Sequence, residues 1–203
     1  MAEFDFTLIL SGISDVTDDQ ADSLFASGCD DATIAQRYGR VYMTFSREAE
    51  TMAQAIISAI EDVRRAGLDD VSVMRVDTCN LVTQAEIARR IDRSRQAVSQ
   101  YISGERGPGS FPPPACNIVE GQPLWYWCEV AYWLSQNDLI KGNENREAQE
   151  IAAINAILEL EQYKTFSLEA TEHFLWNSGL CECPDIKAER EESADSPEEL
   201  QDA

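Results

Sequence analysis

The sequence of 203 residues predicts an α+β protein built in three parts. Residues 1–79 alternate between strand-like and helix-like hydrophobic patterns in the order strand, helix, strand, strand, helix, strand. Residues 81–107 have the capping residues and spacing of two short helices joined by a tight turn. Residues 143–178 carry a broad apolar stripe at helical spacing, which predicts a C-terminal helical segment.

Four segments of the N-terminal part are expected to be strands. Alternating apolar residues predict the first strand, which Ser11-Gly12 ends, and a hairpin turn at Tyr38-Gly39 joins the second and third strands. These strands cover residues 4–10, 32–36, 41–45 and 71–76.

Two helices are expected between these strands. Thr17 and Gln20 form a capping box at the start of the first helix, and Gly28 ends it. Ser46 is expected to cap a long second helix that ends at Gly67. The resulting βαββαβ order is the split βαβ, or ferredoxin-like, arrangement, in which two helices cover one face of a four-stranded antiparallel sheet.

Residues 80–136 are expected to form a winged helix-turn-helix. Thr83 and Glu86 form a second capping box, and Ser94 caps the second helix of the pair. Asp92 stands where a turn glycine is common, and aspartate tolerates the positive φ that such a turn requires.

A loop rich in glycine and proline follows the helix pair, over residues 104–114. Residues 117–119 and 124–126 are then expected to pair as a short hairpin, the wing, around the turn at residues 120–122. A further helix is expected to begin at Trp127 or Cys128.

The charge of the chain is distributed unevenly around the helix pair. The formal net charge is −21, yet residues 84–107 hold five arginines against three acidic residues, a local charge of +2. Residues 1–79, 136–181 and 182–203 have net charges of −9, −5 and −7. An electropositive segment in an acidic chain indicates an anion-binding surface, although the acidity can equally serve only to keep the protein soluble.

The second helix of the pair is expected to present polar side chains to DNA. Arginine can bridge O6 and N7 of guanine, and glutamine can bridge N6 and N7 of adenine. The alternative is an ordinary solvated helix face. The residues expected to contact bases or phosphates are Arg89, Arg90, Arg93, Ser94, Arg95, Gln96, Ser99, Gln100, Ser103 and Arg106.

Residues 81–135 resemble the winged helix-turn-helix of the MerR-type and phage excisionase, or AlpA-like, regulators. The matching residues are Leu81-Val-Thr83, Glu86-Ile-Ala88, Ser94-Arg95-Gln96-Ala-Val98, Gly107-Pro108-Gly109, Phe111-Pro112, Pro123-Leu-Trp125, Glu129-Val130 and Trp133-Leu134. The resemblance implies that the second helix enters the major groove and that the wing, with Arg106 and the glycine-proline loop, lies at the DNA backbone.

The remaining segments carry weaker expectations. The stripe of residues 143–178, with a second helix capped by Ser167, is expected to pack on the winged helix or, slightly favoured, on a second copy of the chain. Residues 183–203 are expected to be a disordered acidic tail. Cys181 and Cys183 with His173 fall short of a four-ligand zinc set, so no metal is expected.

These patterns favour a sequence-specific regulator that binds a double-stranded DNA operator, a repressor or autoregulator of phage or mobile-element type. A homodimer with no cofactor and no catalytic activity is expected. Neither a signal peptide nor an apolar run of about 20 residues is present, so the chain is expected in the cytoplasm without membrane association. The alternative is an acidic interaction module, an antitoxin-like or DNA-mimic protein that neutralises a basic partner.

Overall fold

The computed structural model describes the backbone of residues 1–165 and the side chains of residues 1–163. Met1–Glu161 form one compact unit. Three expectations lie outside the described residues: the helix capped by Ser167, the cysteine pair with His173, and the tail of residues 183–203.

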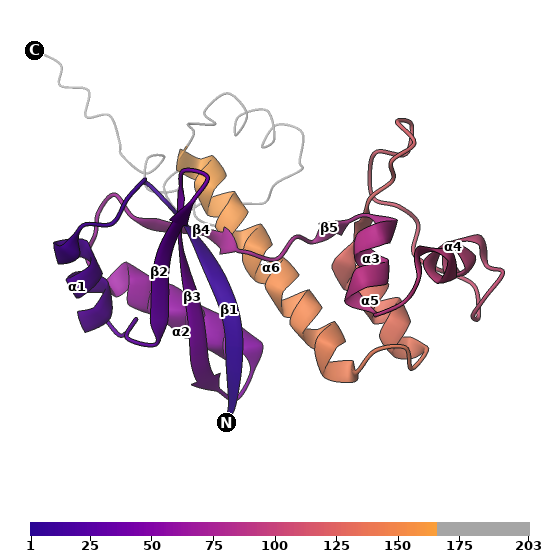
Figure 1. The fold of residues 1–203 in the computed structure, drawn as a ribbon, viewed down its shortest axis with the longest axis horizontal. Helices are drawn as coiled ribbons and strands as arrows, with labels where there is room; N and C mark the ends of the chain where they lie inside the picture. Colours follow the sequence, from indigo (N-terminus) through magenta and orange to yellow (C-terminus); the bar gives the residue numbers. More distant parts are fainter. Residues whose placement is uncertain (166–203) are drawn as a thin grey trace, which may run out of the picture. The chain divides into compact units, whose positions relative to one another are not determined.

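The N-terminal part is a four-stranded antiparallel sheet with strand order β2-β3-β1-β4 (Figure 1). Helices α1 and α2 cover one face of this sheet, so the predicted βαββαβ order is confirmed. In chain order the elements are β1 (Ala2–Ser11), α1 (Asp18–Ala26), β2 (Ala32–Arg37), β3 (Arg40–Ala49), α2 (Met52–Arg65) and β4 (Ser72–Val76).

Alternation along the central strands places one row of apolar side chains in the core. Phe6 of β1 lies opposite Phe45 of β3, and their rings stack with centroids 5.2 Å apart. Leu8 pairs with Met43 in the same register, and both are fully buried. The core therefore lies between the sheet and the two helices, and α1 contributes Leu24 to it.

Both predicted turn signals of this part are present. Thr17 accepts a hydrogen bond from the backbone N–H of Gln20 (3.3 Å), while the Gln20 side chain accepts one from the backbone N–H of Thr17 (3.1 Å). Tyr38 and Gly39 have φ of 53° and 74°, which two-residue hairpin turns of this hand require.

The predicted start of the long helix at Ser46 is wrong. Strand β3 continues to Ala49, and Thr51 caps α2 by accepting a hydrogen bond from the backbone N–H of Gln54. The strand continues because Arg47, a charged residue at an apolar position of the alternation, points inward. Its guanidinium is buried and forms ion pairs with Asp31 and Asp62.

A second buried cluster holds the helix pair together. It is built from β5 (Leu81–Val82), α3 (Gln84–Arg90), α4 (Arg95–Ser103), β6 (Trp125–Tyr126) and α5 (Trp127–Gln136). Ile87 of α3, Val98 of α4 and Leu134 of α5 are fully buried in it. Helix α5 begins at Trp127, one of the two predicted starting residues.

The predicted hairpin after the glycine-proline loop is only partly correct. Residues 117–119 do not form a strand, and a single antiparallel bridge joins Cys116 to Leu124. Strand β6 pairs instead with β5, with Leu81 opposite Tyr126. Residues far apart in the sequence therefore form this small sheet, which short-range patterns cannot predict.

Helix α6 (Gly142–Thr165) packs on the N-terminal sheet. One predicted alternative placed this stripe on the winged helix instead. Ile151, Ile154 and Leu158 join the core of the sheet domain. Ile157 and Leu160, from the same predicted stripe, remain about 60% exposed (60% and 58%). No helix of the described residues is long and apolar enough to cross a membrane. The binding of a second copy of the chain to the exposed apolar residues of α6 stays a prediction.

Candidate nucleic-acid interface

The turn between α3 and α4 sets the angle of the helix pair. Asp92 adopts a φ of 50°, as predicted, and the backbone N–H of Arg93 returns to the carbonyl of Ala88 (2.9 Å). The Gln84 side chain donates a hydrogen bond to the backbone carbonyl of Arg95 (2.9 Å). This bond ties the first residue of α3 to the first residue of α4, and so fixes where α4 begins.

The second capping box is only half formed. Thr83 accepts a hydrogen bond from the backbone N–H of Glu86 (3.2 Å), as predicted. The Glu86 carboxylate, however, accepts from Arg89 (2.6 Å) and Arg90 (3.0 Å). Those hydrogen bonds, the one from Arg89 first, lower the pKa of Glu86 from 4.5 to about 2. Glu86 therefore neutralises part of the predicted electropositive segment.

Arg90 is engaged within the fold. Its guanidinium lies 4.8 Å from the centre of the Trp127 ring and donates to the backbone carbonyl of Cys79 (3.0 Å). Only 17% of its side chain is exposed, compared with 74% for Arg89. A contact from Arg90 to DNA stays a prediction, but its hydrogen bonds and its stacking are already supplied by the protein.

The outward face of α4 carries polar side chains that are exposed. Arg95, Gln96 and Ser99 are exposed, and among the described residues none of their side chains has a hydrogen-bond or ion-pair partner. Gln100 is half-buried, and Ser103 is exposed and donates to the carbonyl of Gln100. The opposite face is buried, with Ala97, Val98 and Tyr101 in the core.

The other predicted contact residues lie at the two ends of α4. Ser94 caps the helix by accepting from the backbone N–H of Ala97 (3.2 Å). Arg93, just before it, is exposed and donates only to the neighbouring carbonyl of Asp92. Arg106, just after the helix, lies 5.5 Å from the centre of the Tyr101 ring. Arg93, Arg95 and Arg106 are thus exposed cations with no carboxylate partner among the described residues.

Two tryptophans hold the glycine-proline loop beside α4. The indole N–H of Trp133 donates to the carbonyl of Gly109 (2.9 Å), and that of Trp125 donates to the carbonyl of Pro112 (3.1 Å). Gly107 has a φ of 83°, and a Cβ there would lie 3.3 Å from the Trp133 ring. The loop that the sequence marks as irregular is therefore held in one conformation by the α5 and β6 side chains.

A cleft of about 360 Å³ lies at the N-terminal ends of α3 and α4. Sequence reasoning identified Arg95 but not the two glutamines beside it, Gln84 and Gln122, because they come from different segments. The lining residues are Thr83, Gln84, Ala85, Arg95, Gly121, Gln122, Pro123 and Trp125. Neutral amides and one arginine can donate hydrogen bonds to phosphate or base oxygens.

The described residues contain no group of three or more histidine, cysteine, aspartate or glutamate side chains that could hold a metal ion. Comparisons with known protein families, curated proteins and solved structures found no match to this chain. The resemblance to MerR-type and AlpA-like regulators therefore stays a prediction that rests on the residues quoted for it.

Proposed function

We propose that this chain is a sequence-specific double-stranded DNA-binding transcriptional regulator, a repressor or autoregulator of phage or mobile-element type. Helix α4 enters the major groove, with the turn before it and the loop after it beside the phosphates. The helix pair, the loop and the β5-β6 sheet would then form a winged helix-turn-helix, and the protein would act in the cytoplasm.

The observation that carries this proposal is that polar side chains on α4 are exposed and unbonded. Arg95, Gln96 and Ser99 are exposed and have no polar partner in the described part of the chain. Arginine and glutamine can form bidentate hydrogen bonds with base edges, and serine can form a single one, at no cost in internal bonds. Arg90, by contrast, is assigned to the fold, because Trp127 and Glu86 already hold it.

The remaining cations are assigned to phosphates. Arg93 and Arg106 flank α4 on either side and are exposed. Few phosphates are neutralised in this arrangement, and the rest of the chain is acidic. Binding to non-specific DNA should therefore be weak, and selectivity should come largely from the base contacts of α4.

Selection from a pool of random DNA duplexes tests the proposal without knowledge of the operator. The wild-type chain is expected to enrich one sequence motif, whereas the variant Arg95→Ala with Gln96→Ala is expected to enrich none. The matched control is Gln36→Ala with Arg37→Ala, an exposed pair of the same residue types on β2. It should enrich the wild-type motif.

Two results would contradict the proposal. The first is that the wild-type chain enriches no motif, and the second is that the α4 variant enriches the same motif as the wild type. If no motif appears and the chain instead captures a basic protein in stoichiometric amount, the acidic interaction module replaces the regulator.

A further inference from the structure

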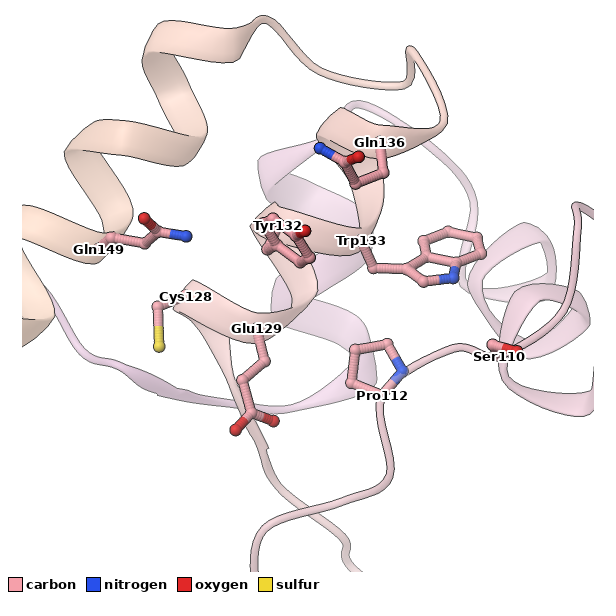
Figure 2. Close-up of a pocket in the computed structure, with 8 residues that line it drawn as sticks. All are labelled: Ser110, Pro112, Cys128, Glu129, Tyr132, Trp133, Gln136 and Gln149. Carbon is pink, nitrogen blue, oxygen red and sulfur yellow. The ribbon is translucent and has the colours of Figure 1, made fainter.

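A second cleft, of about 400 Å³, runs along one face of helix α5 (Figure 2). One wall is the loop with Ser110 and Pro112, and the other is Gln149 of α6. The α5 residues that line it are spaced for one helix face, namely Cys128, Glu129, Tyr132, Trp133 and Gln136. The volume falls within the range of small-molecule sites.

Flat apolar groups dominate this cleft. Figure 2 shows Tyr132 between Gln149 and Trp133, with Pro112 on the loop side. The Trp133 ring is held firmly, because its N–H is bonded to Gly109 and the Phe111 ring packs against it at 5.0 Å. Tyr132 is 53% exposed. A fixed aromatic wall beside an exposed ring favours a planar ligand that can stack.

The charge of the cleft has one sign. Glu129 is the one charged residue in its lining, and within the described residues its carboxylate has no hydrogen-bond or ion-pair partner. No lysine or arginine occurs from residue 107 to residue 140. A carboxylate in the lining attracts a cation by its charge, and the aromatic rings of the same cleft attract it through their quadrupoles.

We propose that this cleft binds a small planar organic cation of two or three fused rings. The ring system stacks on Tyr132 and against Pro112, while the positive charge faces Glu129. Gln136 and Gln149 in the lining can each donate and accept hydrogen bonds. This site shares the loop of Ser110 and Pro112 with the proposed DNA surface but uses none of the α4 side chains, and its binding of the cation does not depend on DNA.

Fluorescence anisotropy of N-methylacridinium with the full-length chain, in the absence of DNA, tests this proposal. Saturable binding at one site per chain is expected. Uncharged acridine at pH 8, which has nearly the same shape, is expected to bind at least about fivefold more weakly, because it lacks the charge that Glu129 attracts. Equal binding of the two probes would overturn the proposal, as would the absence of saturation.

Substitutions assign the binding to this cleft. Glu129→Gln is expected to weaken N-methylacridinium binding about fivefold and Tyr132→Ala about tenfold, whereas Tyr132→Phe keeps the ring and should bind like the wild type. Glu120→Gln and Tyr38→Ala are matched controls, because both residues are exposed and lie outside the cleft. Equal weakening in these controls would show general attraction to an acidic protein and would reject the site.

Discussion

The guanidinium of Arg90 lies 4.8 Å from the centre of the Trp127 ring, across 37 positions of the chain, and this contact ties α3 to the start of α5. Arg95, five positions after Arg90, points outward from α4, and its side chain has no polar partner among the described residues. Arg90 is therefore expected to stabilise the fold, and Arg95 is expected to bind DNA.

Substitution of these two arginines should separate stability from binding. Arg90→Ala is expected to lower the free energy of unfolding by about 1–2 kcal/mol, because it removes a cation–π contact and a partly buried hydrogen bond. Arg95→Ala is expected to change that free energy by less than about 0.5 kcal/mol, because the side chain is exposed. Urea denaturation of both variants measures the difference, and similar losses in the two would contradict the assignment.

Asn155 should be required for the packing of α6 on the sheet. Its side chain accepts a hydrogen bond from the backbone N–H of Val76 (2.7 Å) and donates to the carbonyls of Val76 (3.1 Å) and Thr78 (3.3 Å). Strand β4 is at the edge of the sheet, and Asn155 is the partner of the Val76 N–H there, whereas the Val76 carbonyl also accepts from the backbone N–H of Thr78 and the Thr78 carbonyl also accepts from Arg75.

Asn155→Ala is therefore expected to lower the free energy of unfolding by about 1–3 kcal/mol, since the buried N–H of Val76 loses its partner. Asn143→Ala, at the exposed start of the same helix, is the control and should cost less than about 1 kcal/mol. Urea denaturation measures both. An Asn155 variant as stable as the Asn143 variant would show that water replaces these bonds.

The Arg47 network should be among the most sensitive points of the sheet domain. The guanidinium donates to Asp31, Asp62, Ser58 and the carbonyl of Gly28, at 2.7–3.1 Å. Hydrogen bonds to Asp31, followed by those to Asp62, raise the pKa of Arg47 and keep it charged despite burial. Arg47→Met leaves Asp31 without its ion pair and Asp62 with only the exposed Arg65, and is expected to cost about 3–5 kcal/mol.

The control for Arg47→Met is Arg64→Met. Arg64 also forms an ion pair, with Glu161 at 2.8 Å, but its side chain is 56% exposed. Removal of such a surface pair is expected to cost less than about 1 kcal/mol. Thermal and urea denaturation should show a clearly larger loss of stability for Arg47→Met than for Arg64→Met. Equal losses of stability would mean that the buried ion pairs of Arg47 stabilise the fold no more than an exposed pair.

The stability of the helix pair should depend on pH through Glu86. Hydrogen bonds from Arg89 and Arg90 lower its pKa to about 2 in the folded state, below the value of roughly 4.3 for an unfolded chain. The carboxylate therefore stabilises the fold above about pH 4.3, and this contribution is lost as the pH falls towards 2. Solvent screens the exposed Arg89 pair, so the effect should be about 1 kcal/mol.

Comparison of wild type with Glu86→Gln checks this dependence. The wild type should be more stable by about 1 kcal/mol at pH 6, and the difference should shrink as the pH is lowered to 3. Glu48→Gln on β3 is the control, because Glu48 is exposed and has no ion pair among the described residues. A difference for Glu86→Gln that stays constant with pH would contradict the assigned pairing.

Short-range patterns predicted most of the elements because each signal lies within a few residues. The Thr17 capping box, the Tyr38-Gly39 turn and the positive φ of Asp92 are local features of this kind. The error at Ser46 arose because Arg47 looks like a surface residue, and its partners Asp31 and Asp62 are about 15 positions away.

In the candidate sites, too, features set by nearby residues were predictable and features set by tertiary packing were not. The helical spacing of α4 predicted that Arg95, Gln96 and Ser99 face outward, and the structure places them there. The engagement of Arg90 by Trp127 was not predictable, since it depends on how α5 packs. Neither cleft was predictable, because each is walled by segments that only the tertiary fold brings together.

Methylation protection of guanine N7, on the duplex enriched by the wild-type chain, tests the role of α4 most directly. Arginine contacts guanine at O6 and N7 in the major groove. Wild-type protein is expected to protect at least one guanine, and Arg95→Ala is expected to lose this protection while the other protected positions remain. An unchanged pattern with Arg95→Ala, or no protection of any major-groove guanine by the wild type, would contradict this role of α4.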